Sequence, residues 1–375
     1  MTIDLSKLKF TNQADIVPKL GTDDIVNTGT TNTLDGNDSI TGNSSSNNGI
    51  INYGTLKTSY GNDSITGNSS SNNGIINYGT IDTGCGNDTI NATGSIFGIY
   101  NLSKSSIINT GSGNDTINAT GSTFGIYNLY KSSIINTGCG KDIINATGTN
   151  GTGIENYGTI STGSGHDIIT GNGTTYVGIE NVNSIIDTGN DNDEITGTGN
   201  YTGINNFGLI NTGNGDDIIT GIGTGNGIIT GIGIAGITNY TNCTIITGDG
   251  NDIINATGSI VGISNLGTID TGNGNDIVDA LNGGFSRDGN ILLGNGEDIL
   301  KGFGSGSFDG GQGNDTLLFG TGTYTVSCYG NNNNLYKVSN GSIDMLVQNF
   351  EFIGSASDPA AAFSFASVIG ESFTI

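Results

Sequence analysis

Aliphatic residues recur at three fixed places within a repeated unit of about 25 residues along this chain. Polar residues alternate with them and glycine-rich stretches separate the three places, as is typical of short β-strands joined by tight turns. The first aliphatic column contains Ile40, Ile65, Ile90, Ile117, Ile144, Ile169, Ile195, Ile219, Ile254 and Val278. The second contains Ile50, Ile75, Ile99, Ile126, Ile154, Ile179, Ile204, Ile237 and Ile263. The third contains Leu56, Ile81, Ile108, Ile135, Ile160, Ile186, Ile210, Ile246 and Ile269.

The repeated unit itself is the main clue to the fold. Residues 36–55 return unchanged at 61–80, and residues 86–112 return nearly unchanged at 113–139. Such a period is typical of solenoids, in which each unit buries its apolar face against its neighbours. We therefore predict an all-β fold, a right-handed parallel β-helix of about twelve three-stranded coils over residues 21–320. Residues 1–20 lack the repeat and should cap one end, while alternating segments in residues 321–375 predict a small antiparallel β cap.

Asparagine stands two residues beyond the second aliphatic column in every unit. Because side chains alternate between the two faces of a strand, this asparagine should point into the solenoid beside the aliphatic residue. Stacked amides can hydrogen-bond to one another along the array, which satisfies their polar groups and fixes how one coil aligns with the next. The row contains Asn52, Asn77, Asn101, Asn128, Asn156, Asn181, Asn206, Asn239 and Asn265. We interpret it as structural.

One motif in the repeat is shared with a known group of proteins. The segments GIINYGTI at 74–81 and GIENYGTI at 153–160 resemble the repeats of bacterial right-handed β-helix passengers and adhesins. The resemblance implies a β-helix, and it supports an architecture more than any particular function.

Charge and composition narrow the possible partners. The chain has 34 acidic residues against 10 basic ones, a net charge of −24, which disfavours nucleic acid and anionic membranes and favours cations. No apolar run is long enough to span a membrane, and Met1 to Leu20 lacks the apolar centre of a signal peptide. The four cysteines are too few and too scattered for a disulfide framework, so we expect them to be unpaired.

An aspartate follows the glycine turn of each unit, in the setting glycine, a polar residue, aspartate and then a strand in all units but that of Asp193. The row contains Asp38, Asp63, Asp88, Asp115, Asp142, Asp167, Asp193, Asp217, Asp252, Asp276, Asp298 and Asp315. Carboxylates stacked at strand spacing, about 4.8 Å, repel one another by roughly 1 kcal/mol in water and more in a protein, so the row needs a source of positive charge or hydrogen bonds.

This turn resembles the calcium-binding repeat of RTX, or hemolysin-type, solenoids, as in TGCGNDTIN at 83–91 and DGGQGNDTL at 309–317. In that family, aspartate carboxylates and turn carbonyls from stacked coils hold Ca²⁺. The resemblance thus implies calcium as the cofactor and the twelve aspartates as its ligands. This chain departs from the family's pattern, because its period is longer and only one edge carries the motif. The simpler alternative is that each aspartate accepts backbone hydrogen bonds within its turn.

The carboxyl-terminal segment suggests how such a chain reaches the cell exterior. The segment 344–354 resembles the closing segment after RTX repeats, and GESFTI at 370–375 resembles an uncleaved type I secretion signal. The resemblance implies a secreted, extracellular or cell-surface protein. Folding that depends on calcium would then wait until the chain meets calcium outside the cell.

The function that these features favour is a secreted, calcium-stabilised structural solenoid of a bacterial surface or matrix that self-assembles into filaments or layers. An adhesin or ligand-binding module acting as a monomer, with a cell-surface polysaccharide as a partner, is the main alternative. A β-helix polysaccharide-active enzyme is disfavoured because the chain has one histidine, one arginine and no tryptophan, and no catalytic residue is predicted. A row of threonines directly precedes most of the glycine turns, and such rows occur in ice-binding proteins. Hydrogen bonding within the turns explains this threonine row better.

Overall fold

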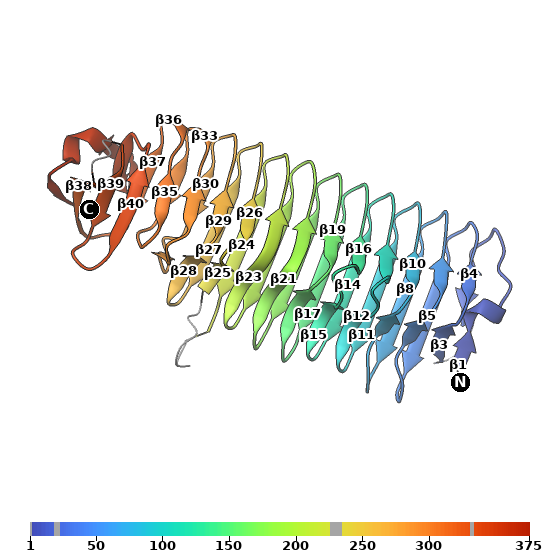
Figure 1. Cartoon of the computed structure of the whole chain (residues 1–375). Helices are drawn as coiled ribbons and strands as arrows, with labels where there is room; N and C mark the ends of the chain where they lie inside the picture. Colours follow the sequence, from blue (N-terminus) through green and yellow to red (C-terminus); the bar gives the residue numbers. More distant parts are fainter. Residues whose placement is uncertain (1, 19–22, 226–234, 331–333) are drawn as a thin grey trace. The chain divides into compact units, whose positions relative to one another are not determined.

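A computed structural model describes residues 2–18, 23–225, 235–330 and 334–375 of the chain (Figure 1). It shows an all-β parallel solenoid of about 11 turns, each of about 25 residues, with almost no helix. The predicted fold class is confirmed, with about 11 turns in place of twelve, because twelve aspartates delimit eleven intervals. The chain divides into two compact units, Met1–Asn200 and Tyr201–Ile375, which are described one at a time.

The first unit stacks three rows of parallel strands. The first row consists of β2 (Ile16–Val17), β5 (Ser39–Ser44), β8 (Ser64–Ser69), β11 (Thr89–Gly94), β14 (Thr116–Gly121), β17 (Ile143–Gly148), β20 (Ile168–Gly173) and β22 (Glu194–Gly199). The second consists of β1 (Thr2–Asp4), β3 (Asp24–Asn27), β6 (Ile50–Asn52), β9 (Ile75–Asn77), β12 (Phe97–Asn101), β15 (Phe124–Asn128), β18 (Thr152–Asn156) and the start of β21 (Val177–Asp187). The third consists of β4 (Thr30–Asn32), β7 (Thr55–Lys57), β10 (Thr80–Asp82), β13 (Ile107–Asn109), β16 (Ile134–Asn136), β19 (Thr159–Ser161) and the end of β21.

The second unit also has three rows of parallel strands, and its last strands pair in antiparallel fashion. Its first row consists of β24 (Ile218–Gly223), β27 (Ile253–Gly258), β30 (Ile277–Asp279), β34 (Ile299–Lys301), β37 (Thr316–Phe319) and β41 (Phe352–Ser355). Its second consists of the start of β23 (Thr202–Asn211), β25 (Ala235–Asn239), β28 (Val261–Asn265) and β31 (Phe285–Ser286). Its third consists of the end of β23, β26 (Thr244–Ile246), β29 (Thr268–Asp270), β32 (Asn290–Leu292), β35 (Ser307–Asp309) and β40 (Asp344–Gln348).

The aliphatic columns predicted from the sequence form the core. Every member that the sequence analysis named is at most 1% exposed, apart from one position in the third column. There Ile245, not Ile246, is fully buried, because β26 pairs Ile245 with Ile210 on one side and with Ile269 on the other. The segment TII offers two adjacent isoleucines, and a shift by one residue moves a side chain to the opposite face of a strand.

The predicted asparagine ladder is confirmed, and it starts one coil earlier than expected, at Asn27. In the first unit each amide nitrogen donates to the Oδ1 atom of the next asparagine at 2.8–3.0 Å, from Asn27 to Asn181. In the second unit the ladder runs from Asn206 through Asn239 to Asn265 at 2.9–3.0 Å. The side chains are buried, so the interior holds a continuous polar row whose donors and acceptors are paired.

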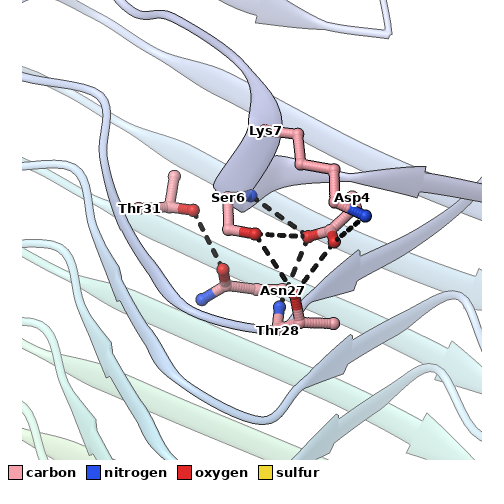
Figure 2. Close-up of polar contacts among 6 residues, drawn as sticks. All are labelled: Asp4, Ser6, Lys7, Asn27, Thr28 and Thr31. Carbon is pink, nitrogen blue, oxygen red and sulfur yellow. Dashed lines mark hydrogen bonds and ion pairs between the residues drawn. The ribbon is translucent and has the colours of Figure 1, made fainter.

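The amino-terminal end of the first unit is closed by its own residues. Strand β1 pairs with β3, β2 pairs with β5, and the 3₁₀ helix η1 (Leu5–Lys7) buries Leu5 completely. Figure 2 shows the polar side of this closure, where Asp4 accepts hydrogen bonds from Ser6 at 2.8 Å and from Thr28 at 2.9 Å. In the same view Thr31 donates at 2.9 Å to Asn27, the first rung of the amide ladder. The boundary that we predicted at residue 20 lies outside the described residues.

Antiparallel strands complete the second unit, as predicted. Strand β38 (Thr323–Cys328) pairs with β39 (Tyr336–Ser339) and with β43 (Ser372–Thr374), and β39 pairs with β40. Strand β41 pairs with β42 (Asp358–Ser364), which is followed by the 3₁₀ helix η2 (Phe365–Val368), and the small pair β33 (Asn295–Gly296) with β36 (Gln312–Gly313) lies in the last turns. The expected secretion segment at 370–375 thus contributes a strand to this sheet.

The longest repeat unit of the sequence includes residues 218–236, and this segment is partly regular. Residues 218–223 form β24 and residue 235 begins β25, while residues 226–234 lie outside the described part of the chain. Among the described residues, no helix has the length and apolar character needed to cross a membrane.

Candidate functional site

Two glycines in each turn place the aspartate row. In the turn 84–88, Gly84 has φ 100° and Gly86 has φ 137°, a backbone region that favours glycine. A Cβ atom on Gly86 would lie 1.7 Å from the carbonyl oxygen of Gly61 in the coil before it. The coils therefore stack too closely at this corner for any side chain, and the aspartate that follows is turned toward the interior.

The carboxylates are buried and bonded to the backbone. All twelve aspartates predicted as metal ligands are at most 2% exposed. In ten pairs within the two units, the backbone N–H of an aspartate donates to the Oδ1 atom of the aspartate one coil later, at 2.7–2.9 Å. At the start of the row, the backbone N–H of Asp15 donates a hydrogen bond to Oδ1 of Asp38. At its end, the N–H of Asp315 donates to the carboxylate of Glu351 at 2.9 Å. One oxygen of each bonded carboxylate thus has a structural partner.

The second carboxylate oxygen has a different environment. The Oδ2 atoms of ten aspartates in the row are buried and lack a well-aligned hydrogen-bond donor. They include those of Asp38, Asp63, Asp88, Asp115 and Asp142. A threonine hydroxyl lies beside several of them and lowers the pKa of the carboxyl group. The same hydroxyls also lie near a carbonyl of the next coil, as Thr83 does to Thr110 O at 3.1 Å. The hydroxyl hydrogen can serve only one of these two acceptors at a time.

Burial shifts the titration of the row. Burial away from water raises the pKa of Asp63 and Asp115 to about 6, although hydrogen bonds to these carboxyl groups lower it in part. The pKa of Asp298 is raised furthest, to about 7, because burial is reinforced by the charges of Asp276 and Asp315. The row therefore stores unfavourable electrostatic energy when it is fully ionised.

The arrangement meets only part of what calcium requires. The buried Oδ2 atoms are hard oxygen ligands that lack a donor, but Ca²⁺ takes about six to eight oxygens. Within the described residues, no group of three or more histidine, cysteine, aspartate or glutamate side chains is placed to hold a metal ion. The row by itself does not complete a calcium shell, and the geometry assigns it a hydrogen-bonding role. Calcium binding by the twelve aspartates stays a prediction.

A second ladder on the outer side of the turn was missed from the sequence. The residue before each aspartate is exposed, and in most units it is asparagine. Its Oδ1 atom accepts the backbone N–H of the same position one coil later, as Asn37 does from Asn62 at 2.9 Å and Asn62 does from Asn87 at 2.8 Å. The predominance of asparagine at this position was the available signal, because asparagine side chains commonly bond to nearby backbone.

Other chemically active side chains are scattered. His166 is exposed on its turn, Cys85, Cys139 and Cys328 are exposed free thiols, and Cys243 is buried. The threonine row considered for ice binding is buried along the inside of the turns, including Thr83, so it presents no face to water. These positions do not bring a nucleophile and a base together.

No known protein-family model matches this chain, and no curated protein matches it. The fold therefore defines the class, a parallel β-solenoid protein. The resemblance to RTX proteins therefore rests on the sequence motifs alone, in the turns and in the carboxyl-terminal segment.

Two substitutions of one aspartate separate the contribution of its hydrogen bond from that of its charge. Asp142 accepts the N–H of Asp115 at 2.8 Å and is fully buried. We expect Asp142→Ala to lower the free energy of unfolding by about 1–3 kcal/mol, because a buried N–H loses its acceptor. Asp142→Asn keeps an oxygen acceptor of the same shape and removes a charge, so in chelator it should stay within about 1 kcal/mol of the parent. Urea unfolding in chelator measures both variants, and equal losses in the two would show that the charge itself is required.

Proposed function

We propose that this chain is a structural β-solenoid of a bacterial surface or extracellular matrix, working as a scaffold and contact surface instead of a catalyst. The observation that carries the proposal is how the coils use their polar residues. Aspartate, asparagine and threonine, which dominate the polar positions of the repeat, bond coil to coil in continuous rows. Side chains held in this way stiffen an array and are not available to take part in turnover.

Secretion and calcium stabilisation are further parts of this proposal. Export through a type I pathway is suggested by the carboxyl-terminal segment and by its resemblance to RTX proteins. Calcium is suggested by the same resemblance and by the buried carboxylate oxygens that lack donors. A cation bound only by the folded chain would raise its stability with the logarithm of the calcium concentration once that concentration exceeds the dissociation constant.

Self-assembly is the third part. Exposed strand edges promote association of β proteins, and the amino-terminal edge of the first unit is closed by β1, β2 and η1. We therefore propose that copies associate through the sides of their coils, where residues such as Tyr53 and Tyr60 are 54% and 64% exposed. The alternative, a monomeric adhesive module, is favoured by an aromatic cluster on the second strand row of the first unit.

One experiment tests these parts separately. Protein treated with EDTA is titrated with calcium while β-structure is followed by circular dichroism, and mass is followed by size-exclusion chromatography with light scattering. Calcium-dependent folding together with growth in mass would support the full proposal. A chain that is folded and monomeric in chelator, and stays monomeric with calcium, would contradict calcium stabilisation and self-assembly and would favour the adhesive module.

A further inference from the structure

An aromatic cluster lies on the second strand row of the first unit. Strands β12 and β15 belong to the nearly identical repeats (Figure 1). They pair in parallel and place Phe97 against Phe124, with ring centroids 5.4 Å apart. Tyr100 stacks on Tyr127 at 5.2 Å with an angle of 10° between the rings, and Tyr157 meets Tyr127 edge-on at 6.1 Å. None of these five rings is fully buried. Clustered apolar surface that a fold leaves in contact with water commonly marks a binding site.

The repeat is broken directly after this cluster, and a hollow results. Phe97, Phe124 and Thr152 occupy the same register position in three successive coils. Threonine is much smaller than phenylalanine, and a hollow of about 260 Å³ lies at this place. Its lining includes Phe124, Thr152, Tyr176, Val177 and Glu180. The hollow is thus lined by one aromatic ring from the coil before Thr152, that of Phe124, and by one from the coil after it, that of Tyr176. Tyr176 is 52% exposed.

The neighbouring row changes from aromatic to acidic at the same coil. Tyr127 is followed in register by Glu155, and Glu155 is followed by Glu180. Burial and then the charge of Glu180 raise the pKa of Glu155, and burial and then the charge of Glu155 raise the pKa of Tyr127 to about 12. Within the described part of the chain, Glu155 forms no ion pair with a lysine or arginine. The carboxylate of Glu180 lines the hollow, and Glu155 lies beside Glu180 in the register of the preceding coil.

We infer that this hollow binds an organic ammonium group, with the rings of Phe124 and Tyr176 against the cation and the carboxylates of Glu180 and Glu155 balancing its charge. The face of an aromatic ring attracts a cation that lies over it, and such contacts strengthen as water is excluded. The hollow is below the usual size of a pocket for a whole drug-sized molecule, so it suits one head group or one sugar unit. The net charge of −24 favours the approach of cations over anions. This inference is independent of calcium binding and of self-assembly.

The direct test compares ligands that differ only in charge. Choline is titrated into the full chain by calorimetry, beside its uncharged isostere, in which a tert-butyl group replaces the trimethylammonium group. We expect choline to bind about tenfold more tightly than the isostere, within the range of a partly desolvated cation–π contact. Glucosamine and N-acetylglucosamine form a second matched pair. Preference for choline would assign a quaternary head group, and preference for glucosamine would assign an amino sugar. Equal binding of charged and uncharged partners, or no binding in either pair, would overturn the inference.

Variants place the binding at the hollow. Thr152→Phe restores the aromatic residue of the two preceding coils and should abolish binding by filling the space, while the urea midpoint stays unchanged or rises. Glu180→Gln should weaken choline binding by about tenfold and leave binding of the isostere unchanged. Phe97→Ala is the control, because Phe97 is the counterpart of Phe124 in the preceding repeat and does not line the hollow. This variant should bind choline as the parent does. Full binding by a folded Thr152→Phe variant would contradict the proposed location.

Discussion

Replacing Asn128 by alanine will lower the free energy of unfolding by about 2–4 kcal/mol, because it interrupts the amide ladder and leaves a cavity. Asn128 accepts from Asn101 at 2.9 Å and donates to Asn156 at 2.8 Å, and it is fully buried. Its neighbours keep other contacts, as Asn101 does with the carbonyl of Ile134 at 3.2 Å, which limits the loss. Chemical denaturation followed by circular dichroism measures the effect.

The control for this change is an asparagine on the outward face of β17. Asn145 is exposed, and its amide bonds to Asn118 at 3.1 Å. Asn145→Ala removes the same atoms without opening the core, so we expect a change of no more than about 0.5 kcal/mol. Similar losses for Asn128→Ala and Asn145→Ala would mean that the inner ladder adds nothing beyond ordinary surface hydrogen bonds.

Stability in chelator will increase as the pH falls from about 8 to about 5, the reverse of what paired surface carboxylates produce. The carboxyl groups of Asp63, Asp115, Asp276 and Asp315 have their pKa raised to about 6, and that of Asp298 is raised to about 7. Groups whose pKa is higher in the folded chain than in the unfolded chain contribute stability below the unfolded value, here near 3.8, and lose it as the pH rises through the folded value. The loss should therefore extend from about pH 4 to about pH 7.

Further acidification should end this gain. Hydrogen bonds outweigh burial at Asp4 and Asp24 and hold the pKa of both groups below the ordinary value, so their contribution is lost below about pH 4. Maximum stability is thus expected near pH 4 to 5, which urea midpoints across the range would measure. Asp298→Asn should flatten the upper part of the profile, because it removes the group with the highest raised value. A midpoint that climbs steadily from pH 5 to 8 in chelator would contradict the buried, uncompensated row.

Calcium offers a second test of the same profile. A divalent cation bound to the carboxylates would compete with protons and favour the ionised row. Saturating calcium should then stabilise the chain most at high pH, and the slope should flatten or reverse. If calcium leaves the profile unchanged, the row is held by hydrogen bonds and protonation alone.

The sequence by itself determined the fold to an unusual degree. A period of about 25 residues with three aliphatic columns specifies three short strands per coil, because strands stacked in register bring identical positions together. The same reasoning placed the asparagine row inside and predicted its ladder. Local repetition sufficed here, since each coil contacts mainly its neighbours in sequence.

Only the tertiary structure decided what the polar positions do. The motif around Asp142 fits a calcium ligand or a hydrogen-bond acceptor, and only the structure shows the backbone N–H of Asp115 that stacking brings to its Oδ1 atom. The adjacent Ile245 and Ile246 are equivalent until the register of β26 places one of them inside. The hollow beside Phe124 arises because the next coil carries Thr152, and the consequence of that substitution appears only when the coils are stacked. Side chains from different coils meet through stacking distance and register, which composition and spacing along one chain do not contain.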